Sequence, residues 1–269
     1  MIEITQIRDR FRDAMLHQDP FPYGWIDDFL PMPEYRALEA GFLFPDAHPS
    51  VTTLAKGKKR ILFCVPPVAA GLGPVGAEWQ GFLQIIGSRD FRSHCLGWVR
   101  QILHPDTLPA GPYRELFKIR QMLEPDDVEM QCEFSNLSPG VLLPPHSDST
   151  DKILSFIHYF TPPGWREEWS GSTEIYRPKD PRQLLNFSNF FLARDAVEIV
   201  NSCVYRSNRL FFFVKNDRAW HGVSQLPEVV GTPRLSFNFS LRIKSGVPLK
   251  SKMASLHAVI RANEQRSFA

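Results

Sequence analysis

Residues 234–243 read Arg-Leu-Ser-Phe-Asn-Phe-Ser-Leu-Arg-Ile, an unbroken alternation of polar and apolar side chains. Successive side chains of a β-strand point to opposite faces, so this stretch predicts a strand with one apolar and one polar face. The apolar face needs a packed partner, which the helices expected near the N-terminus can supply. The polar face can then line a wet cavity inside a barrel. That face carries Arg234, Ser236, Asn238 and Ser240.

Upstream of this strand, from about residue 128, short apolar segments are separated by Pro, Gly, Ser and Asn. About eight short strands in one stretch indicate a barrel or a two-sheet jelly roll. The expected strands are 128–137, 141–147, 152–160, 172–176, 196–204, 210–214, 220–226 and 234–243.

The N-terminal part has a different character, with apolar residues at helical spacing. We expect helices at 4–15, 33–42 and 91–103, strands at 23–29 and 59–65, a Gly/Pro-rich loop at 66–76 and a closing helix at 253–261. At 269 residues the chain predicts a single domain, 1–269. Within it we expect a helix-rich region 1–127 packed on a jelly-roll catalytic core 128–244, followed by a helical tail 245–269.

The charge balance excludes some classes of partner. The net charge of +2 makes no global case for nucleic acid or an anionic membrane. A basic run, Lys56 to Arg60, has no aromatic residues between its charges for base stacking and is interpreted as a solvated loop. No apolar run is long enough to span a membrane. We therefore expect a small-molecule substrate as partner, no nucleic acid and no membrane; the oligomeric state is open.

The four cysteines, Cys64, Cys95, Cys132 and Cys203, form no Cys-x-x-Cys pair. This spacing argues against zinc-ribbon and thioredoxin-type sites and favours buried free thiols. No secretory signal is visible at the N-terminus. A reduced, cytoplasmic compartment is the expectation.

Histidine and aspartate residues suggest a metal centre. His146 and Asp148 are two residues apart, which on a strand places both side chains on one face. His221 follows far along the chain, and Arg234 comes at the start of the alternating strand. Two imidazoles and one carboxylate on one face of an iron(II) ion leave positions open for a chelating co-substrate and dioxygen. A lone His-x-Asp is a weak signal, but the joint order of these residues is much rarer than its parts.

These residues resemble the iron(II)- and 2-oxoglutarate-dependent dioxygenases, in particular their prolyl-hydroxylase-like branch. That family has an aromatic, a glycine and a second aromatic at three-residue steps before its His-x-Asp. Here Gly140 and the metal pair match, whereas Leu137 and Leu143 stand at the aromatic positions. Residues 157–176 and 20–30 are similar to other family segments, with Ser170 at the place of a usual glycine. The similarity covers roughly 20–45 and 128–244.

The resemblance implies a mainly β fold with α-helices: a double-stranded β-helix (jelly roll, cupin-like) core flanked by N-terminal helices. Carried over by position, His146, Asp148 and His221 would bind Fe(II) and act as the catalytic centre. Arg234 would pair with the distal carboxylate of 2-oxoglutarate, because its planar fork suits bidentate recognition. Ser236 shares its face, and Tyr159 is a candidate for a further co-substrate contact.

The implied activity is hydroxylation of a C–H bond by an oxidoreductase that consumes dioxygen and 2-oxoglutarate and releases succinate and CO2. Related halogenases lack the metal carboxylate, which Asp148 supplies here. The substrate is open among amino acids, peptidyl residues, sugars and natural products. Segment 46–127 and the loop around Trp165 and Trp169, a possible lid, are the expected specificity elements. Two alternatives stay open: a cupin-like metal enzyme that does not use 2-oxoglutarate, and a non-enzymatic ligand-binding jelly roll.

Overall fold

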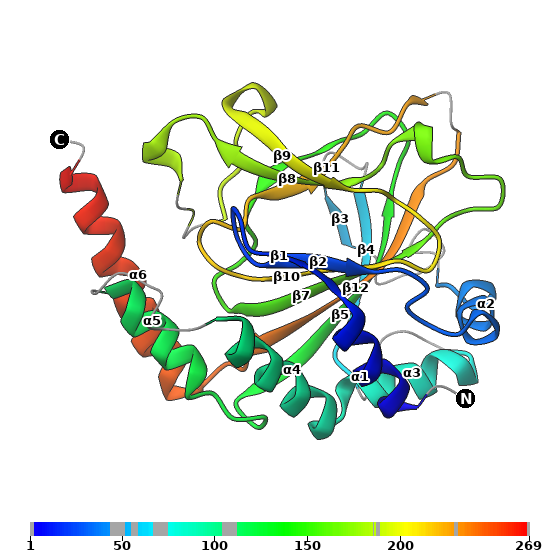
Figure 1. Ribbon diagram of the computed structural model, residues 1–269, viewed down its shortest axis with the longest axis horizontal. Helices are drawn as coiled ribbons and strands as arrows, with labels where there is room; N and C mark the ends of the chain where they lie inside the picture. Colours follow the sequence, from blue (N-terminus) through cyan, green and yellow to red (C-terminus); the bar gives the residue numbers. More distant parts are fainter. Residues whose placement is uncertain are drawn as a thin grey trace.

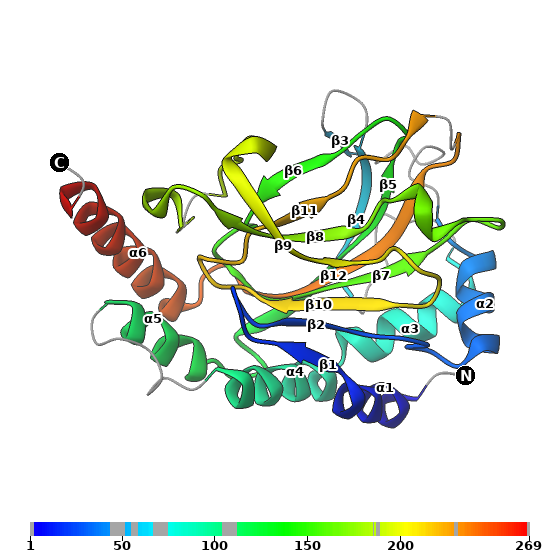
Figure 2. The same cartoon turned by 45° about the horizontal axis from the view of Figure 1, so that its top comes forward.

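A computed structural model of the protein describes residues 3–43, 52–54, 59–66, 75–103, 112–184, 186, 189–228 and 231–267. Its strands form two antiparallel sheets that face one another (Figures 1 and 2). The larger sheet has the order β1-β2-β10-β7-β12-β5-β4-β3, and the smaller has the order β6-β11-β8-β9.

The strands of the larger sheet are β1 (Met15–His17), β2 (Tyr23–Ile26), β3 (Thr52–Leu54), β4 (Lys59–Cys64), β5 (Val128–Leu137), β7 (Lys152–Phe160), β10 (Leu210–Val214) and β12 (Arg234–Ile243). Those of the smaller sheet are β6 (Leu143–His146), β8 (Thr173–Pro178), β9 (Val197–Cys203) and β11 (His221–Val223). From β5 to β12 the chain crosses repeatedly between the sheets, with β5, β7, β10 and β12 in one and β6, β8, β9 and β11 in the other. This connectivity is a double-stranded β-helix, so the expected fold class is confirmed.

Helices cover the outer face of the larger sheet (Figure 2). They are α1 (Ile4–Arg10), α2 (Met32–Ala40), α3 (Ala77–Gly87) and α4 (Arg89–Ile102), while α5 (Pro112–Gln121) and α6 (Pro248–Ser267) pack on each other at one end. The alternating strand explains why. Phe237 and Phe239 of β12 point out of the roll, and Phe82 of α3 contacts both rings, at centroid distances of 5.9 and 6.3 Å. The apolar face of residues 234–243 thus meets the helices, as its pattern predicts.

The interior between the sheets is divided into two parts. Toward β2 and β10 it is filled by a buried apolar cluster that includes Tyr23, Tyr159 and Phe213. Toward β4, β5 and β12 it is a cavity with polar walls. The division follows the sequence, because β12 supplies polar side chains to the cavity whereas β10 (LFFFV) is apolar on both faces.

Some expected elements differ from the structure. The first helix stops at Arg10 and a short 3-10 turn follows, because Met15 pairs with Trp25 in β1 instead of continuing the helix. Helices α3 and α5 and strands β1 and β3 were not expected from the sequence. The tail helix is longer than the expected 253–261. Most of the predicted loop 66–76 lies outside the described residues. All four cysteines are buried and free, as predicted. Among the described helices, none combines the length and apolarity needed to cross a bilayer.

Candidate metal centre

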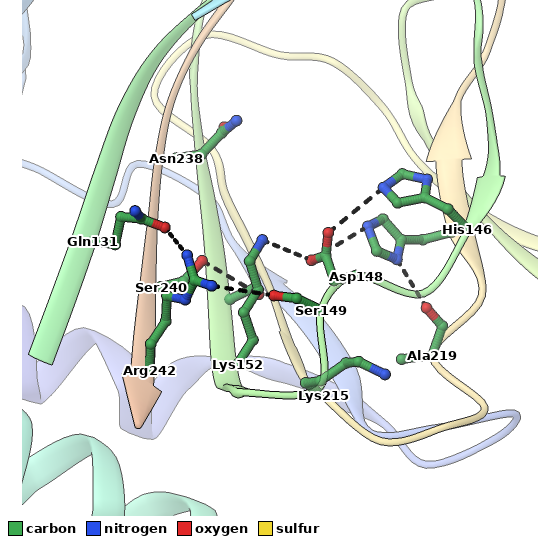
Figure 3. Close-up of polar contacts among 12 residues, drawn as sticks. Gln131, His146, Asp148, Ser149, Lys152, Lys215, Ala219, Asn238, Ser240 and Arg242 are labelled. Atoms are coloured by element: carbon green, nitrogen blue, oxygen red, sulfur yellow. Dashed lines mark hydrogen bonds and ion pairs between the residues drawn. The ribbon is translucent and has the colours of Figure 1, made fainter. Parts of the chain in front are cut away.

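Three side chains on the smaller-sheet side of the cavity converge on one another. His146 ends β6, His221 begins β11, and these two residues are direct partners in the antiparallel register. One ligand atom from each of His146, Asp148 and His221 lies within 4.8 Å of the others. The Nε2 atoms of His146 and His221 lie 3.6 and 3.9 Å from the carboxylate oxygens of Asp148 (Figure 3). This spacing fits three donors around a single ion.

Both imidazoles are held in the tautomer that a metal site requires. His146 Nδ1 lies 2.9 Å from the carbonyl of Pro144, and His221 Nδ1 lies 2.8 Å from the carbonyl of Ala219. A carbonyl oxygen accepts only, so each Nδ1 carries the hydrogen and donates it. In the neutral ring, Nε2 then keeps its lone pair on the side that faces Asp148. Backbone carbonyls that orient ligand histidines in this way are common in metal sites.

The expectation that Asp148 shares a strand face with His146 is wrong. Strand β6 ends at His146, and Asp148 lies in the following turn with φ of 67°. Its side chain therefore does not share a strand face with His146. Aspartate is among the few residues that tolerate this left-handed conformation. The turn is anchored: Arg242 donates to Asp151 at 2.7 Å, and Ser147 donates to the carbonyl of Asn186 at 3.0 Å.

The charges favour an ionised Asp148 carboxylate beside a neutral His221 imidazole. Burial alone would raise the pKa of Asp148, but the Lys152 ammonium, 3.0 Å from Oδ2, and the two histidines outweigh it and hold the pKa well below its ordinary value. Burial, helped by the neighbouring His146, lowers the pKa of His221 to about 3. At neutral pH the cluster offers a carboxylate and an unprotonated His221 nitrogen, and nitrogen and carboxylate ligands of this kind bind divalent transition metals.

Arg234 lies in the wall of the same cavity and is 4% exposed. Its guanidinium carbon is 5.0 Å from the ring centroids of both Tyr159 and Tyr205. Nε donates to the carbonyl of Gly171 at 2.7 Å, and the terminal nitrogens reach Thr173 Oγ1 and Ser236 Oγ at 3.3 and 3.4 Å. Within the described part of the chain no carboxylate forms an ion pair with it. A buried guanidinium with two N–H groups to spare is suited to an anionic ligand.

The two other residues expected to contact a co-substrate lie beside Arg234. Ser236 is fully buried, and its hydroxyl accepts from Arg234. Tyr159 lies on the side of Arg234 away from the cavity and does not line the cavity. Its hydroxyl is hydrogen-bonded to Thr173 Oγ1 at 2.6 Å. The position of Tyr159 therefore suits support of the guanidinium rather than contact with a ligand.

Several cavity residues were not singled out from the sequence. Lys152, Glu133 and Lys59 all line the cavity. Lys59 was interpreted as part of a solvated loop. The structure contradicts this, because Lys59 begins β4 and its Nζ lies 3.8 Å from Glu133. Arg60 of that basic run also lies in β4, whereas Lys56 and Lys58 lie outside the described residues. The usable signal was the alternation of β5, whose polar residues 131, 133 and 135 extend the polar face of β12 in register.

The expected lid residues lie near the Arg234 end of the cavity. The Trp165 ring contacts Tyr205 at a centroid distance of 4.9 Å and Trp169 at 5.6 Å. Trp165 also lies within 3.6 Å of the position that a side chain on Gly171 would take. The loop therefore closes the roll behind the guanidinium.

Comparison with known proteins gives structural neighbours only. No family model matches the chain, and no curated protein matches it. A prolyl-4-hydroxylase from Pseudomonas putida is 17% identical, with 89% of this chain and 98% of that chain covered and a TM-score of 0.46. A prolyl hydroxylase from Trichoplax adhaerens, in complex with a hypoxia inducible factor peptide fragment, is 11% identical, with 89% of each chain covered and a TM-score of 0.45.

HygX from Streptomyces hygroscopicus, solved with nickel, 2-oxoglutarate and hygromycin B bound, is 11% identical, with 83% of each chain covered and a TM-score of 0.43. These neighbours are of the class that the sequence motifs resemble.

Proposed function

We propose that the protein is an Fe(II)- and 2-oxoglutarate-dependent dioxygenase that hydroxylates a C–H bond of a small or medium-sized organic substrate. One observation carries the proposal: a facial set of two imidazoles and one carboxylate shares a cavity with a buried guanidinium that has no carboxylate partner among the described residues. The first feature suits Fe(II), and the second suits the distal carboxylate of a dicarboxylate co-substrate.

The overall reaction balances with these components. Substrate C–H, 2-oxoglutarate and dioxygen give substrate C–OH, succinate and CO2, with one oxygen atom in the new hydroxyl and the other in succinate. Bound iron would supply the activation of dioxygen. His146, Asp148 and His221 would hold the ion and leave one side of it open toward the cavity.

The remaining residues have supporting roles. Arg234 would bind and orient the co-substrate, with Ser236 beside it and Tyr159 and Tyr205 fixing the plane of the guanidinium. Lys152 would hold Asp148 Oδ2 and so turn the carboxylate toward the ion. The apolar cluster around Phe213 would exclude water from the β10 side of the site.

Succinate formation tests the proposal. The protein is incubated with Fe(II), 2-oxoglutarate and dioxygen, with and without candidate substrates from the open classes. We expect a slow background release of succinate, stimulated by a true substrate and absent in His221→Ala. Succinate release that is the same in wild type and His221→Ala would contradict the proposal. Metal binding without any affinity for 2-oxoglutarate would favour a cupin-like metal enzyme, and ligand binding without metal binding would favour a non-enzymatic jelly roll.

A further inference from the structure

The cavity wall opposite the metal ligands carries polar groups that the proposed reaction does not use. Asn238 of β12 and Glu133 of β5 are direct register partners on this wall, with Lys59 of β4 beside them. Figure 3 draws Asn238 across from Asp148 and His146. A molecule held by this wall would face the open side of the metal centre. The inference below rests on the proposed function and concerns the substrate of that same site.

The side-chain carbonyl oxygen of Asn238 has no hydrogen-bond partner among the described residues. Its amide nitrogen donates a short hydrogen bond to Glu133 Oε1, whereas its carbonyl oxygen is buried and accepts no hydrogen bond from the described residues. Turning the amide over would set its oxygen against the Glu133 carboxylate, so the carboxylate fixes which atom is free. A buried acceptor without a donor costs about 1–3 kcal/mol, which a ligand donor can recover.

Glu133 adds further acceptor capacity next to this oxygen. A carboxylate offers about four lone-pair positions, and Asn238 uses one of them. The Lys59 ammonium is 3.8 Å away, which is too long for a direct hydrogen bond. Phe63 is the register partner of Glu133 on β4, so its side chain projects from the same side of the sheet, and it is 41% exposed. The Glu133 carboxylate therefore has an exposed aromatic side chain as its neighbour on the same face of the sheet.

We propose that the Asn238–Glu133 pair is the substrate-orienting subsite, and that it binds an N–H or O–H donor group of the substrate, an amine or a hydroxyl. The substrate class is thus one that carries such a donor on a mainly apolar frame, which can pack against Phe63. A carboxylate-bearing substrate fits this wall less well, because Asn238 presents its oxygen and the Lys59 ammonium already faces the Glu133 carboxylate at 3.8 Å.

Four small probes that share one ring test the subsite. Benzylamine, benzyl alcohol, toluene and benzoate are titrated into the wild-type protein, with and without Mn(II) and 2-oxoglutarate, and binding is followed by ligand-observed NMR. We expect benzylamine or benzyl alcohol to bind about tenfold tighter than toluene and benzoate, the ratio that corresponds to about 1.4 kcal/mol. Equal binding of all four probes, or tighter binding of benzoate, would overturn the proposal.

Two variants locate the preference and identify the donor. Asn238→Leu keeps the size of the side chain and removes its acceptor, so the preference over toluene should disappear. Glu133→Gln removes the charge and keeps an acceptor; it should weaken benzylamine about tenfold and benzyl alcohol less than threefold if the subsite favours an ammonium, and both equally if it favours a neutral donor. Glu129→Gln is the matched control, because Glu129 is on the same strand and does not line the cavity.

The outcomes separate this subsite from the proposed function. The comparison of probes in the wild-type protein does not depend on any variant folding. If Mn(II) and 2-oxoglutarate fail to bind while the donor preference and its loss in Asn238→Leu persist, the proposed function falls and the subsite stands. If both bind and no donor preference is found, only the subsite falls. The same loss of preference in Glu129→Gln as in Asn238→Leu would also overturn it.

Discussion

The imidazoles of His146 and His221 are each oriented by a hydrogen bond to a backbone carbonyl. The guanidinium of Arg234 is oriented by two tyrosine rings and a glycine carbonyl. In each case the orienting groups are neutral. The charge of Arg234 thus stays available to a ligand, and the lone pairs of the imidazoles stay available to a metal. Asp148 differs from these residues, because the group that orients its carboxylate, the Lys152 ammonium, is charged.

Arg234→Gln is expected to weaken the binding of 2-oxoglutarate by about 10- to 150-fold, the range for losing a charge-assisted hydrogen bond of about 1.5–3 kcal/mol. Arg234→Lys should recover only part of the affinity, because an ammonium cannot match the bidentate fork. Calorimetric titration of 2-oxoglutarate into the metal-loaded protein measures both. Arg182→Gln, at an exposed arginine, is the control. Unchanged affinity in Arg234→Gln would show that another residue binds the carboxylate.

His158 gives the fold a defined sensitivity to acid. Burial lowers the pKa of His158 to about 3, against 6.5 for an ordinary histidine. Between pH 6.5 and 3 the unfolded chain therefore binds a proton that the folded chain does not. The neutral ring makes its full contribution to the free energy of unfolding above pH 6.5. That contribution is lost as the pH falls, by about 2 kcal/mol at pH 5.

His158→Gln should make the free energy of unfolding less dependent on pH between 6.5 and 4, at some cost in stability at neutral pH from lost packing against Phe29 and Phe160. Urea denaturation at a series of pH values measures the slope. The matched control is His17→Gln, because His17 lies in the peripheral strand β1. An unaltered slope in His158→Gln would refute the assignment.

At the scale of elements, the metal centre depends on how closely β6 approaches β11. Gly222 follows His221, and a Cβ atom there would lie 2.5 Å from the carbonyl oxygen of Leu143 and 3.0 Å from the Tyr176 ring. A side chain at this position would separate the two strands that carry His146 and His221. Glycine at position 222 therefore fixes the separation of the two imidazoles.

Gly222→Ala is expected to weaken metal binding at least tenfold and to lower the free energy of unfolding by about 1–3 kcal/mol, the usual cost of overpacking. Gly97→Ala in α4 is the contrasting control, because no atom of the described residues lies within 4 Å of a Cβ there and alanine favours a helix by about 0.5–1 kcal/mol. Metal titration and urea denaturation of both variants provide the comparison. Wild-type metal affinity in Gly222→Ala would show that the strands can separate without harm to the site.

At the scale of the whole molecule, the larger sheet separates an apolar layer of helices from a polar cavity. Strand β12 contributes to both, with Phe237 and Phe239 on the helix side and Asn238 and Ser240 on the cavity side. Packing and ligand binding are therefore carried by opposite faces of the same strand, and changes on one face can be made without altering the chemistry of the other.

Phe82→Ala is expected to lower the free energy of unfolding by about 3–5 kcal/mol, because the fully buried ring packs against Phe237 and Phe239. The metal affinity of the folded fraction should stay within about threefold of wild type. Phe191→Ala, at a 56% exposed ring, should cost far less stability. A large loss of metal affinity in folded Phe82→Ala would mean that the two faces are coupled.

Metal binding should itself stabilise the fold, because His221 comes from a segment far along the chain from His146 and Asp148, and only the folded chain brings the three side chains together. At a free Mn(II) concentration of about 100 times Kd, the expected gain is about 2.7 kcal/mol. Thermal denaturation with Mn(II), and again after addition of a chelator, measures the gain and its reversal. No metal-dependent change should occur in Asp148→Ala. An equal gain in that variant would place the ion elsewhere.

The alternation of residues 234–243 determined the strand, its two faces and the face on which Arg234 lies, because strand periodicity is a local property of the chain. The same reason explains why β5 matches its expected bounds. Strands β7 and β10 match theirs because they are short apolar runs bounded by polar and turn residues. Helices α3 and α5 were not predicted, because they lie in segment 46–127, which matches no segment of the resembled family. Their stability comes from tertiary packing, of α3 on the sheet and of α5 on α6.

Only the tertiary structure decided how Asp148 reaches the histidines and which residues face them across the cavity. The turn after β6 takes its left-handed form because Arg242, from the distant strand β12, anchors it through Asp151. Glu133 and Asn238 become neighbours through sheet register, which pairs residues far apart in the chain. Lys59 is paired with Leu137, and its long side chain reaches Glu133. Local periodicity can assign a side chain to a face, but long-range pairing decides what lies beside it.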